Sequence, residues 1–144
     1  ISLNNKVIKN HWIKYEFFTY SKFKNIFRGM HFQKPPFSQK KLFIVCSGSI
    51  KTYLINITKK NFGKAYIYKL NKGDALFVPE GYANGFKTTS SNVIINYKLS
   101  NKFSANHYIS FSPILFNIDI ENLIISKKDK TSKINLDYLK KIKW

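Results

Sequence analysis

Short runs of β-branched and aromatic residues, separated by clusters of turn residues, dominate the middle of the chain. The turn signals are prolines, glycines and asparagines that recur between residues 35 and 92. The runs that they separate cover residues 42–46, 50–55, 65–70, 75–78 and 93–97. Many short strands with regular turns are typical of a β-sandwich or β-barrel, so the pattern predicts an all-β fold.

Side chains in the segment from residue 49 to residue 56 show a partial alternation, which would place them on two different faces of a strand. The two faces hold Ile50, Thr52, Leu54 and Asn56 on one side and Lys51, Tyr53 and Ile55 on the other. In an antiparallel sheet such a pattern is typical of a strand that packs on the core with one face. We therefore predict that the second face of this strand is half exposed to water.

The two ends of the chain differ from its middle. The apolar residues of the last segment are spaced as on one face of a helix and follow a cap residue: Leu136, Leu139 and Ile142 after Asn135. This predicts a short amphipathic helix within residues 134–144 that packs on the outside of the barrel. Residues 1–26 are interpreted as N-terminal strands or an arm. Because 144 residues are enough for one domain but not for two ordinary ones, residues 1–144 are predicted to form a single domain.

The chain carries a formal net charge of +18, which by itself favours binding to nucleic acid or to an anionic membrane. Of the 25 basic residues only Arg28 is an arginine, and the others are lysines scattered along the chain. Proteins that read bases or follow phosphates usually use arginine forks as well. We interpret the charge as a solvated lysine-rich surface and expect no nucleic-acid partner. A positive field would still attract a substrate that carries a diphosphate.

A single cysteine, Cys46, lies inside the apolar run that begins at residue 41. One thiol cannot form a disulfide or a thiolate metal site within the chain, and its neighbours predict a buried, inert side chain. No apolar stretch approaches the roughly 20 residues of a membrane span, and no signal-peptide pattern opens the sequence. The sequence therefore predicts a cytoplasmic protein without a membrane partner.

Residues 27–36 hold the most informative pattern, because a guanidinium and an imidazole lie three positions apart. On a regular strand Arg28 and His31 would point to opposite faces, since side chains alternate with a period of two. Gly29 between them could supply a bulge that returns both to one face. Taken alone, a histidine between two apolar neighbours is more typical of a buried core residue.

Ordered blocks along the chain match the motifs of one known family. The blocks are Arg28-Gly29-Met30-His31-Phe32-Gln33 with Lys41, Phe62-Gly63-Lys64, residues 77–86, Tyr97-Lys98 and residues 124–129. In these blocks the chain resembles the dTDP-4-dehydrorhamnose 3,5-epimerase family. The resemblance implies a cupin-like jelly-roll β-barrel and an isomerase that needs no cofactor. It also implies a homodimer and, as substrate, a nucleotide-linked 4-keto-6-deoxy sugar that serves as a precursor of surface polysaccharide.

By this resemblance four residues carry the chemistry. His31 is the general base that removes a proton at C3 or C5, where the C4 ketone acidifies the C–H bond. Asp129 accepts the other ring N–H of His31 and fixes its tautomer. Lys41 stabilises the enolate oxygen, and Tyr97 returns a proton from the opposite face. Taken one by one, Lys41 and Asp129 are more typical of solvated surface charges, and Tyr97 of a strand aromatic.

The resemblance also implies residues that contact the substrate, and these are Arg28, Gln33, Asn84 and Phe103. Arg28 would clamp the diphosphate with its bidentate fork, and Phe103 would stack near the base. Asn84 stands where the family has a histidine. An amide can form hydrogen bonds but cannot take up a proton, so the sequence leaves open whether C3, C5 or both are inverted.

Three other functions stay open on the sequence. A sugar-nucleotide 3,4-ketoisomerase would use the same base but move the carbonyl group. A non-catalytic module would bind a sugar nucleotide or a polyanion through its basic surface. A metal-dependent cupin needs histidines and a carboxylate at ligand spacing. His11, His31 and His107 are widely separated and no His-x-His motif occurs, so we expect no metal site.

Overall fold

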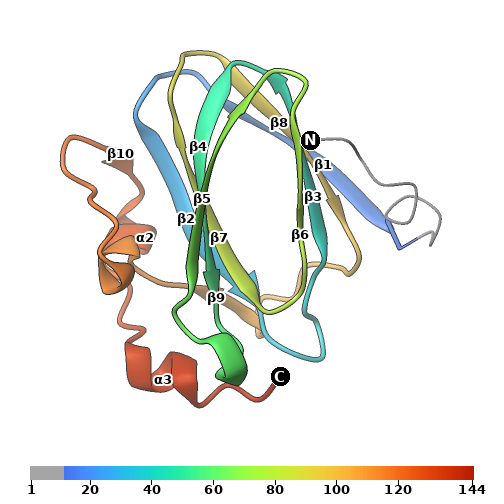
Figure 1. The fold of residues 1–144 in the computed structure, drawn as a ribbon, viewed down its shortest axis with the longest axis vertical. Helices are drawn as coiled ribbons and strands as arrows, with labels where there is room; N and C mark the ends of the chain where they lie inside the picture. The colour runs from blue at the N-terminus through green and yellow to red at the C-terminus, as the bar shows by residue number, and fades with distance from the viewer. Residues whose placement is uncertain (1–11) are drawn as a thin grey trace.

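The computed structural model describes residues 12–144, which form two facing sheets with the C-terminal segment against one of them (Figure 1). The four-stranded sheet has the order β1 (Tyr15–Ser21), β8 (Val93–Leu99), β3 (Lys41–Ser47) and β6 (Ala75–Val78). The six-stranded sheet has the order β10 (Ile124–Ile125), β2 (Ile26–Gln33), β7 (Tyr82–Thr88), β4 (Ser49–Asn56) and β5 (Ala65–Asn71), and β9 (Tyr108–Ser110) also pairs with β2. Among these residues every strand pair is antiparallel except β10 with β2.

The five predicted strand runs lie within β3, β4, β5, β6 and β8, so the all-β prediction is confirmed. Within residues 12–144 the strands form two separate hydrogen-bonded sheets rather than one closed barrel. Part of the predicted N-terminal arm, residues 1–11, lies outside the described residues. The remainder of that arm contains β1, which pairs with β8 along its whole length.

An inner cluster of buried apolar residues fills one part of the space between the two sheets. We define it as Phe43, Val45, Ile50, Leu54, Leu70, Leu76, Val78, Phe86, Val93, Ile95, Tyr97 and Leu99. The alternation of β8 sends every second side chain inward, which brings Val93, Ile95 and Tyr97 together. Complete burial of one such apolar side chain contributes about 1.5–3 kcal/mol. The inner cluster therefore holds the two sheets against each other.

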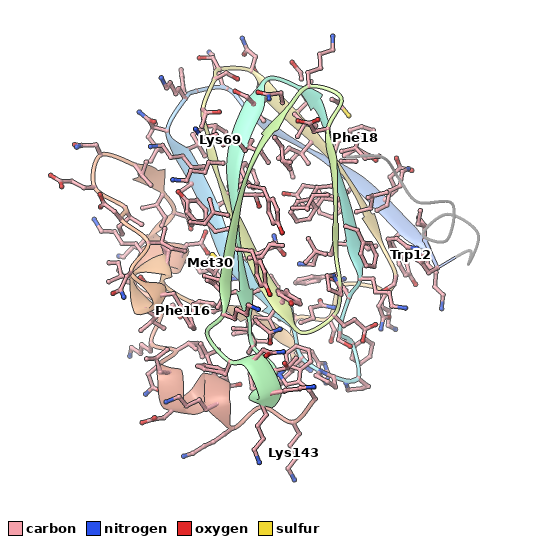
Figure 2. All side chains as sticks on the ribbon, viewed as in Figure 1. Trp12, Phe18, Met30, Lys69, Phe116 and Lys143 are labelled. Atoms are coloured by element: carbon pink, nitrogen blue, oxygen red, sulfur yellow. The ribbon has the colours of Figure 1, made fainter. Side chains whose placement is uncertain are left out.

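An outer cluster covers the opposite face of the six-stranded sheet, between that sheet and the C-terminal segment (Figure 2). We define it as Phe27, Met30, Phe32, Tyr53, Ile55, Ile57, Ala83, Ile109, Phe111, Ile118 and Leu139. Because Tyr53 and Ile55 belong to this cluster, the prediction of a half-exposed second face on β4 is wrong at this end of the strand. The C-terminal segment buries that face, and periodicity within one strand cannot reveal such a distant cover.

The C-terminal segment contains three short helices: η2 (Pro113–Phe116), α2 (Lys127–Lys130) and α3 (Leu136–Lys140). A further short helix, η1 (Lys59–Asn61), connects β4 to β5. The side chain of Asn135 caps α3 by accepting a hydrogen bond from the backbone N–H of Tyr138. Leu139 is completely buried in the outer cluster, so the predicted terminal helix and its position outside the sheets are confirmed. No helix within residues 12–144 is both long and apolar enough to cross a membrane.

Cys46 is exposed, which contradicts the prediction of a buried thiol. The pairing of β3 with β8 changes register between Val45 and Ser47, so Cys46 lies at an irregular point of the strand. Val45 points into the inner cluster. The alternation then leaves the next side chain outside, although the run of residues around it is apolar.

Candidate active site

A cavity of about 870 Å³ lies between the two sheets, beside the inner cluster. The eight predicted site residues all line it: Arg28, His31, Gln33, Lys41, Asn84, Tyr97, Phe103 and Asp129. They come from four strands of both sheets, from the loop after β8 and from α2. The fold therefore brings together residues that are far apart in the sequence.

A bulge at Gly29 places Arg28 and His31 on the same face of β2. The pairing of β2 with β7 changes register between these two residues, and Gly29 has a φ angle of 125°. A Cβ atom at this position would lie 2.5 Å from the Cα atom of Gly85 on β7, so no larger residue fits. Met30 points to the outer cluster while Arg28 and His31 line the cavity. The irregularity predicted at Gly29 is confirmed.

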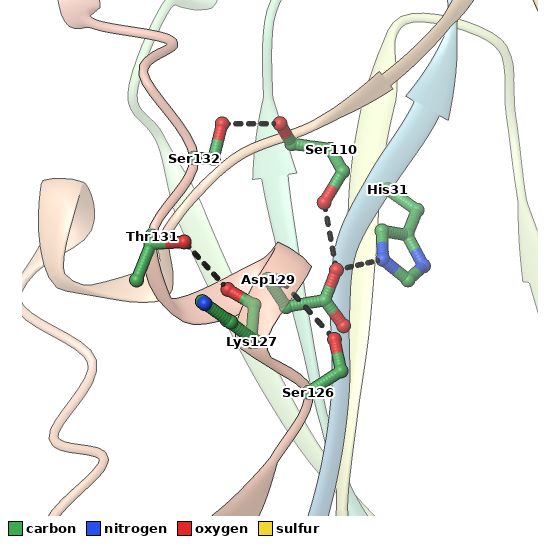
Figure 3. Close-up of polar contacts among 7 residues, drawn as sticks. All are labelled: His31, Ser110, Ser126, Lys127, Asp129, Thr131 and Ser132. Carbon is green, nitrogen blue, oxygen red and sulfur yellow. Dashed lines mark hydrogen bonds and ion pairs between the residues drawn. The ribbon is translucent and has the colours of Figure 1, made fainter.

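His31 and Asp129 form a hydrogen-bonded pair at the cavity wall (Figure 3). Nε2 of His31 lies 2.7 Å from Oδ1 of Asp129. When Nε2 carries the proton and donates this bond, Nδ1 of the neutral ring is left as an acceptor. His31 lines the cavity, so it is not the buried core residue that its two apolar neighbours alone suggest.

Asp129 is fixed by several hydrogen bonds around α2. Its backbone N–H donates to Oγ of Ser126, the N-cap of the helix, at 3.1 Å. Oγ of Ser110 donates to Oδ1 of Asp129 at 2.7 Å. Burial raises the pKa of this carboxyl, but hydrogen bonds and the charge of His31 outweigh burial and lower the pKa to about 2. At 5% exposure Asp129 is not the solvated surface charge that its lysine-rich neighbours suggest.

Lys41 and Asn84 link the two sheets across the cavity. Nζ of Lys41 on β3 donates a hydrogen bond to Oδ1 of Asn84 on β7 at 2.6 Å. Lys41 is 8% exposed, and burial lowers its pKa to about 8. Lys41 is therefore not the solvated surface lysine that its residue type alone suggests. Because this partner is a neutral amide, the positive charge is available to an anion in the cavity.

Tyr97 lies on β8, in the sheet opposite β2. Its ring stacks on Phe17 of β1, with 4.7 Å between the ring centroids and 1° between the planes. Phe43 meets it edge-on at 4.6 Å. Burial raises the pKa of the Tyr97 phenol, whereas the charge of Arg28 and a hydrogen bond with Thr19 act in the opposite direction. The phenol therefore keeps its proton at neutral pH, as a proton donor must.

Arg28 is exposed at the side of the cavity next to β1. Its Nε donates to Oγ of Ser21 and its Nη2 to the backbone carbonyl of Tyr20, each at 3.2 Å. Neither of the two ion pairs found among residues 12–144 involves Arg28. β1 thus orients the guanidinium without neutralising it by a carboxylate.

Gln33 and Phe103, two of the predicted substrate contacts, have contrasting surroundings. The amide nitrogen of Gln33 donates to the backbone carbonyls of Phe37 and Lys102 at 2.7 and 3.0 Å. Its Oε1 accepts a hydrogen bond from the N–H of Ser104 at 2.7 Å. These bonds tie two loops to β2 and occupy much of the amide. Phe103 is 65% exposed, and for both residues a contact with substrate stays a prediction.

Sequence reasoning missed Tyr108 and Lys128, which also line the cavity. The Tyr108 ring lies between two predicted site residues, 5.3 Å from the His31 ring and 5.4 Å from the Phe103 ring. Nζ of Lys128 lies 4.7 Å from the centroid of the Tyr108 ring. β9 has only three residues, which is too short for a periodic signal. Lys128 could have been predicted to lie near the site, because it is next to Asp129 in the sequence.

Basic side chains outnumber acidic ones around the cavity. Among the described lining residues, Arg28, Lys41 and Lys128 are basic and Asp129 is the carboxylate. This excess of positive charge favours an anionic ligand such as a diphosphate. No group of three His, Cys, Asp or Glu side chains suited to a metal ion occurs within residues 12–144. His11 lies outside the described residues.

Sequence comparisons with known proteins point to one family. The family model described as dTDP-4-dehydrorhamnose 3,5-epimerase matches residues 3–136. The protein of that name from Shigella flexneri is 30% identical over 125 residues, which cover 80% of this chain and 69% of the relative. The protein of that name from Sinorhizobium fredii (strain NBRC 101917 / NGR234) is 34% identical over 84 residues, which cover 56% of this chain. The latter match spans 43% of the relative's length.

Solved structures show the same likeness in three dimensions. The dTDP-4-dehydrorhamnose 3,5-epimerase of Bacillus anthracis, with TDP and PPi bound, has 30% identity and a TM-score of 0.80, covering 89% of this chain and 80% of that chain. The Legionella pneumophila dTDP-6-deoxy-D-glucose-3,5-epimerase, in complex with dTDP-4-keto-L-rhamnose, has 25% identity and a TM-score of 0.73, covering 81% and 66%. The expected cupin-like jelly-roll fold is thereby confirmed. Because the family model spans almost the whole chain and the fold agrees, the chain belongs to the dTDP-4-dehydrorhamnose 3,5-epimerase family.

Proposed function

We propose that the chain is an epimerase of a nucleotide-linked 4-keto-6-deoxy sugar, which inverts C3, C5 or both and so supplies surface polysaccharide precursors. The observation that carries this proposal is the His31–Asp129 pair, joined at 2.7 Å, in a cavity that Tyr97 lines from the opposite sheet. A base and an acid on facing walls can act on opposite faces of a sugar ring, as inversion requires. The ligands bound in the related structures support a nucleotide or nucleotide-sugar ligand.

His31 removes the proton in this proposal. Because Nε2 pairs with Asp129, the lone pair of Nδ1 is available to take a proton from carbon. The C–H bond beside a ketone is acidified, since the charge that forms moves onto the C4 oxygen. Asp129 then stabilises the imidazolium. Its low pKa of about 2 keeps it ionised throughout the neutral range.

Lys41 stabilises the enolate that proton removal leaves behind. With a pKa of about 8, its amine is mainly protonated at neutral pH. Asn84 holds Nζ by accepting one of its hydrogen bonds. A cation that is already desolvated and oriented stabilises the enolate oxygen with little reorganisation. The amide of Asn84 supplies hydrogen bonds where the family has a titratable histidine, so the charge near the C4 oxygen comes from Lys41.

Tyr97 returns the proton to the opposite face of the same carbon, which completes the inversion. The buried phenol has a raised pKa and therefore starts the step protonated; solvent restores its proton afterwards. Arg28 binds the diphosphate with its fork-shaped guanidinium, and Lys128 adds a second positive charge at the cavity. These contacts hold the sugar ring between base and acid.

Deuterium wash-in tests the proposed function directly. The chain is incubated in D₂O with dTDP-4-keto-6-deoxy-D-glucose, and the sugar is followed by NMR. We expect deuterium at C3, C5 or both, inversion at a labelled carbon, and a carbonyl group that stays at C4. Migration of the carbonyl to C3 would identify a ketoisomerase instead. Binding without any exchange would identify a non-catalytic module and contradict the proposal.

We also propose that residues 1–144 act as a single domain within a homodimer. β1 is the edge strand of the four-stranded sheet, and Phe18 and Tyr20 on it are 62% and 55% exposed. An edge strand with exposed aromatic residues favours association with a second copy. Analytical ultracentrifugation should give about twice the mass of the chain, and a monomer at high micromolar concentration would contradict the dimer.

A further inference from the structure

β9 brings Ser110 directly opposite His31. The antiparallel pairing of β9 with β2 sets His31 against Ser110 and Phe32 against Ile109. Asp129 reaches the same place from α2 (Figure 3). Ile109 is buried in the outer cluster, so the alternation of this short strand turns Ser110 to the other side, toward Asp129.

The Ser110 hydroxyl donates to the same carboxylate oxygen that contacts His31. Oγ of Ser110 lies 2.7 Å from Oδ1 of Asp129, and Nε2 of His31 lies 2.7 Å from that same atom. Ser110 is buried. Its own backbone carbonyl accepts a hydrogen bond from Oγ of Ser132 at 2.8 Å. The donor to Asp129 is therefore itself held on a strand and by a side chain from the C-terminal segment.

A carboxylate that accepts two bonds on one oxygen loses its freedom to rotate about the Cβ–Cγ bond. If Oδ1 turned away from His31, the bond from Ser110 would break as well, and a buried hydroxyl would lose its partner. Ser110 lies outside the main cavity and lines a smaller adjoining pocket. The hydroxyl of Ser110 thus reaches the imidazole through Asp129, and Ser110 is not among the residues that line the main cavity.

We propose that Ser110 is a positioning residue for the base, because its hydroxyl locks Oδ1 of Asp129 against His31. This inference rests on the proposed function, in which His31 removes the proton. Partners that orient the ligands of a metal site typically contribute about 10- to 100-fold to metal affinity or activity, and we expect an effect of the same order where the oriented group is a catalytic base. The role needs only the hydroxyl of Ser110 and the carboxylate of Asp129.

The first test compares Ser110→Ala with Ser110→Thr in the deuterium-exchange assay. We expect Ser110→Ala to lower the exchange rate at saturating substrate about tenfold with KM unchanged. Ser110→Thr keeps a hydroxyl and should recover most of the rate. Ser112→Ala is the matched control, because Ser112 carries a buried hydroxyl that has no hydrogen-bond partner within residues 12–144. An unchanged rate in Ser110→Ala, or an equal loss in Ser112→Ala, would overturn the proposal.

The second test asks whether Ser110 acts through Asp129. In an Asp129→Asn background the Ser110→Ala change should have little further effect on the exchange rate, because the two groups act as one unit. A tenfold loss in both backgrounds would show that Ser110 works by another route, and the proposal would fail.

The third test does not depend on catalysis, so it separates this proposal from the proposed function. In ¹H–¹⁵N NMR of the whole chain, the proton on Nε2 of His31 should give a downfield resonance protected from solvent. Ser110→Ala should broaden or remove this resonance, while Ser112→Ala should keep it. If the unmodified chain exchanges no deuterium, the proposed function fails, yet this resonance still decides the role of Ser110. An identical resonance in the unmodified chain and in Ser110→Ala would overturn that role.

Discussion

The inner and outer clusters lie on opposite faces of the six-stranded sheet, and each builds a different half of the site. Tyr97 is itself a member of the inner cluster, so packing between the sheets directly places the residue that we propose as the acid. Asp129 belongs to the C-terminal segment, which the outer cluster holds against the back of the sheet. The proposed acid therefore depends on burial between the sheets, whereas the proposed base is completed by a segment that packs on the back of the six-stranded sheet.

Removing the proposed base and the proposed acid in turn should change the reaction more than any other substitution considered below. His31→Gln should lower both deuterium exchange and inversion about 10³-fold, because no base remains at the cavity wall. Tyr97→Phe keeps the ring that packs on Phe17 and Phe43 but loses the proton donor. It should therefore reduce inversion far more than exchange. NMR of the sugar in D₂O measures both quantities, and equal losses of exchange and inversion in Tyr97→Phe would contradict separate acid and base halves.

Two variants that each create a cavity test whether the inner and outer clusters support different parts of the proposed site. Leu139→Ala in the outer cluster and Leu70→Ala in the inner cluster each remove a completely buried side chain. Each should lower the free energy of unfolding by about 3 kcal/mol, measured by urea denaturation. Leu139→Ala should in addition slow exchange under conditions where both variants are folded, since it loosens the segment that carries Asp129. Equal exchange rates in the two folded variants would remove the distinction.

Lys41, which is hydrogen-bonded to Asn84 between the two sheets, should set an upper pH limit to activity. Burial lowers the Lys41 pKa to about 8, so above that pH the amine becomes neutral and no longer stabilises the enolate. The rate should fall about tenfold per pH unit above pH 8. Tyr97, whose pKa is raised, loses its proton only at higher pH. Lys41→Arg should move this limit upward because the guanidinium stays charged, and a rate that is constant to pH 9.5 would disprove the assignment.

A smaller effect is expected on the free energy of unfolding at acid pH, and it depends on Asp129 alone. The Asp129 pKa is lowered from 3.8 to about 2, so the folded state favours the ionised form. The stabilisation is complete above about pH 4 and is lost as the pH falls toward 2. Urea denaturation should show that Asp129→Asn is less stable than the unmodified chain at pH 6, with a difference that narrows by pH 3. A constant difference would mean that Asp129 does not couple folding to pH.

Five strands could be predicted from the sequence because their signals are local, whereas the eight predicted site residues come from the resemblance of ordered blocks to the motifs of one family. The runs of β-branched and aromatic residues mark these strands, and the odd spacing of Arg28 and His31 indicates the irregularity found at Gly29, while the role of His31 as the base stays a proposal. The cover over Tyr53 could not be predicted, because it includes the C-terminal segment, which begins sixty positions later in the sequence. The position of Ser110 could not be predicted either. It lies opposite His31 because of the pairing of a three-residue strand, and so short a strand has no periodic pattern of its own.

The bulge in β2 has an unusual consequence for changes in chain length. Between the pairs Arg28–Phe86 and His31–Asn84, β7 has one residue, Gly85, whereas β2 has two, Gly29 and Met30. With one residue fewer between Arg28 and His31, the ordinary alternation of a strand would by itself point both side chains to one face. A side chain added at Gly29 would instead push against the backbone of β7. We therefore expect the loss of one residue between Arg28 and His31 to disturb the pairing of β2 with β7 less than a side chain added at Gly29.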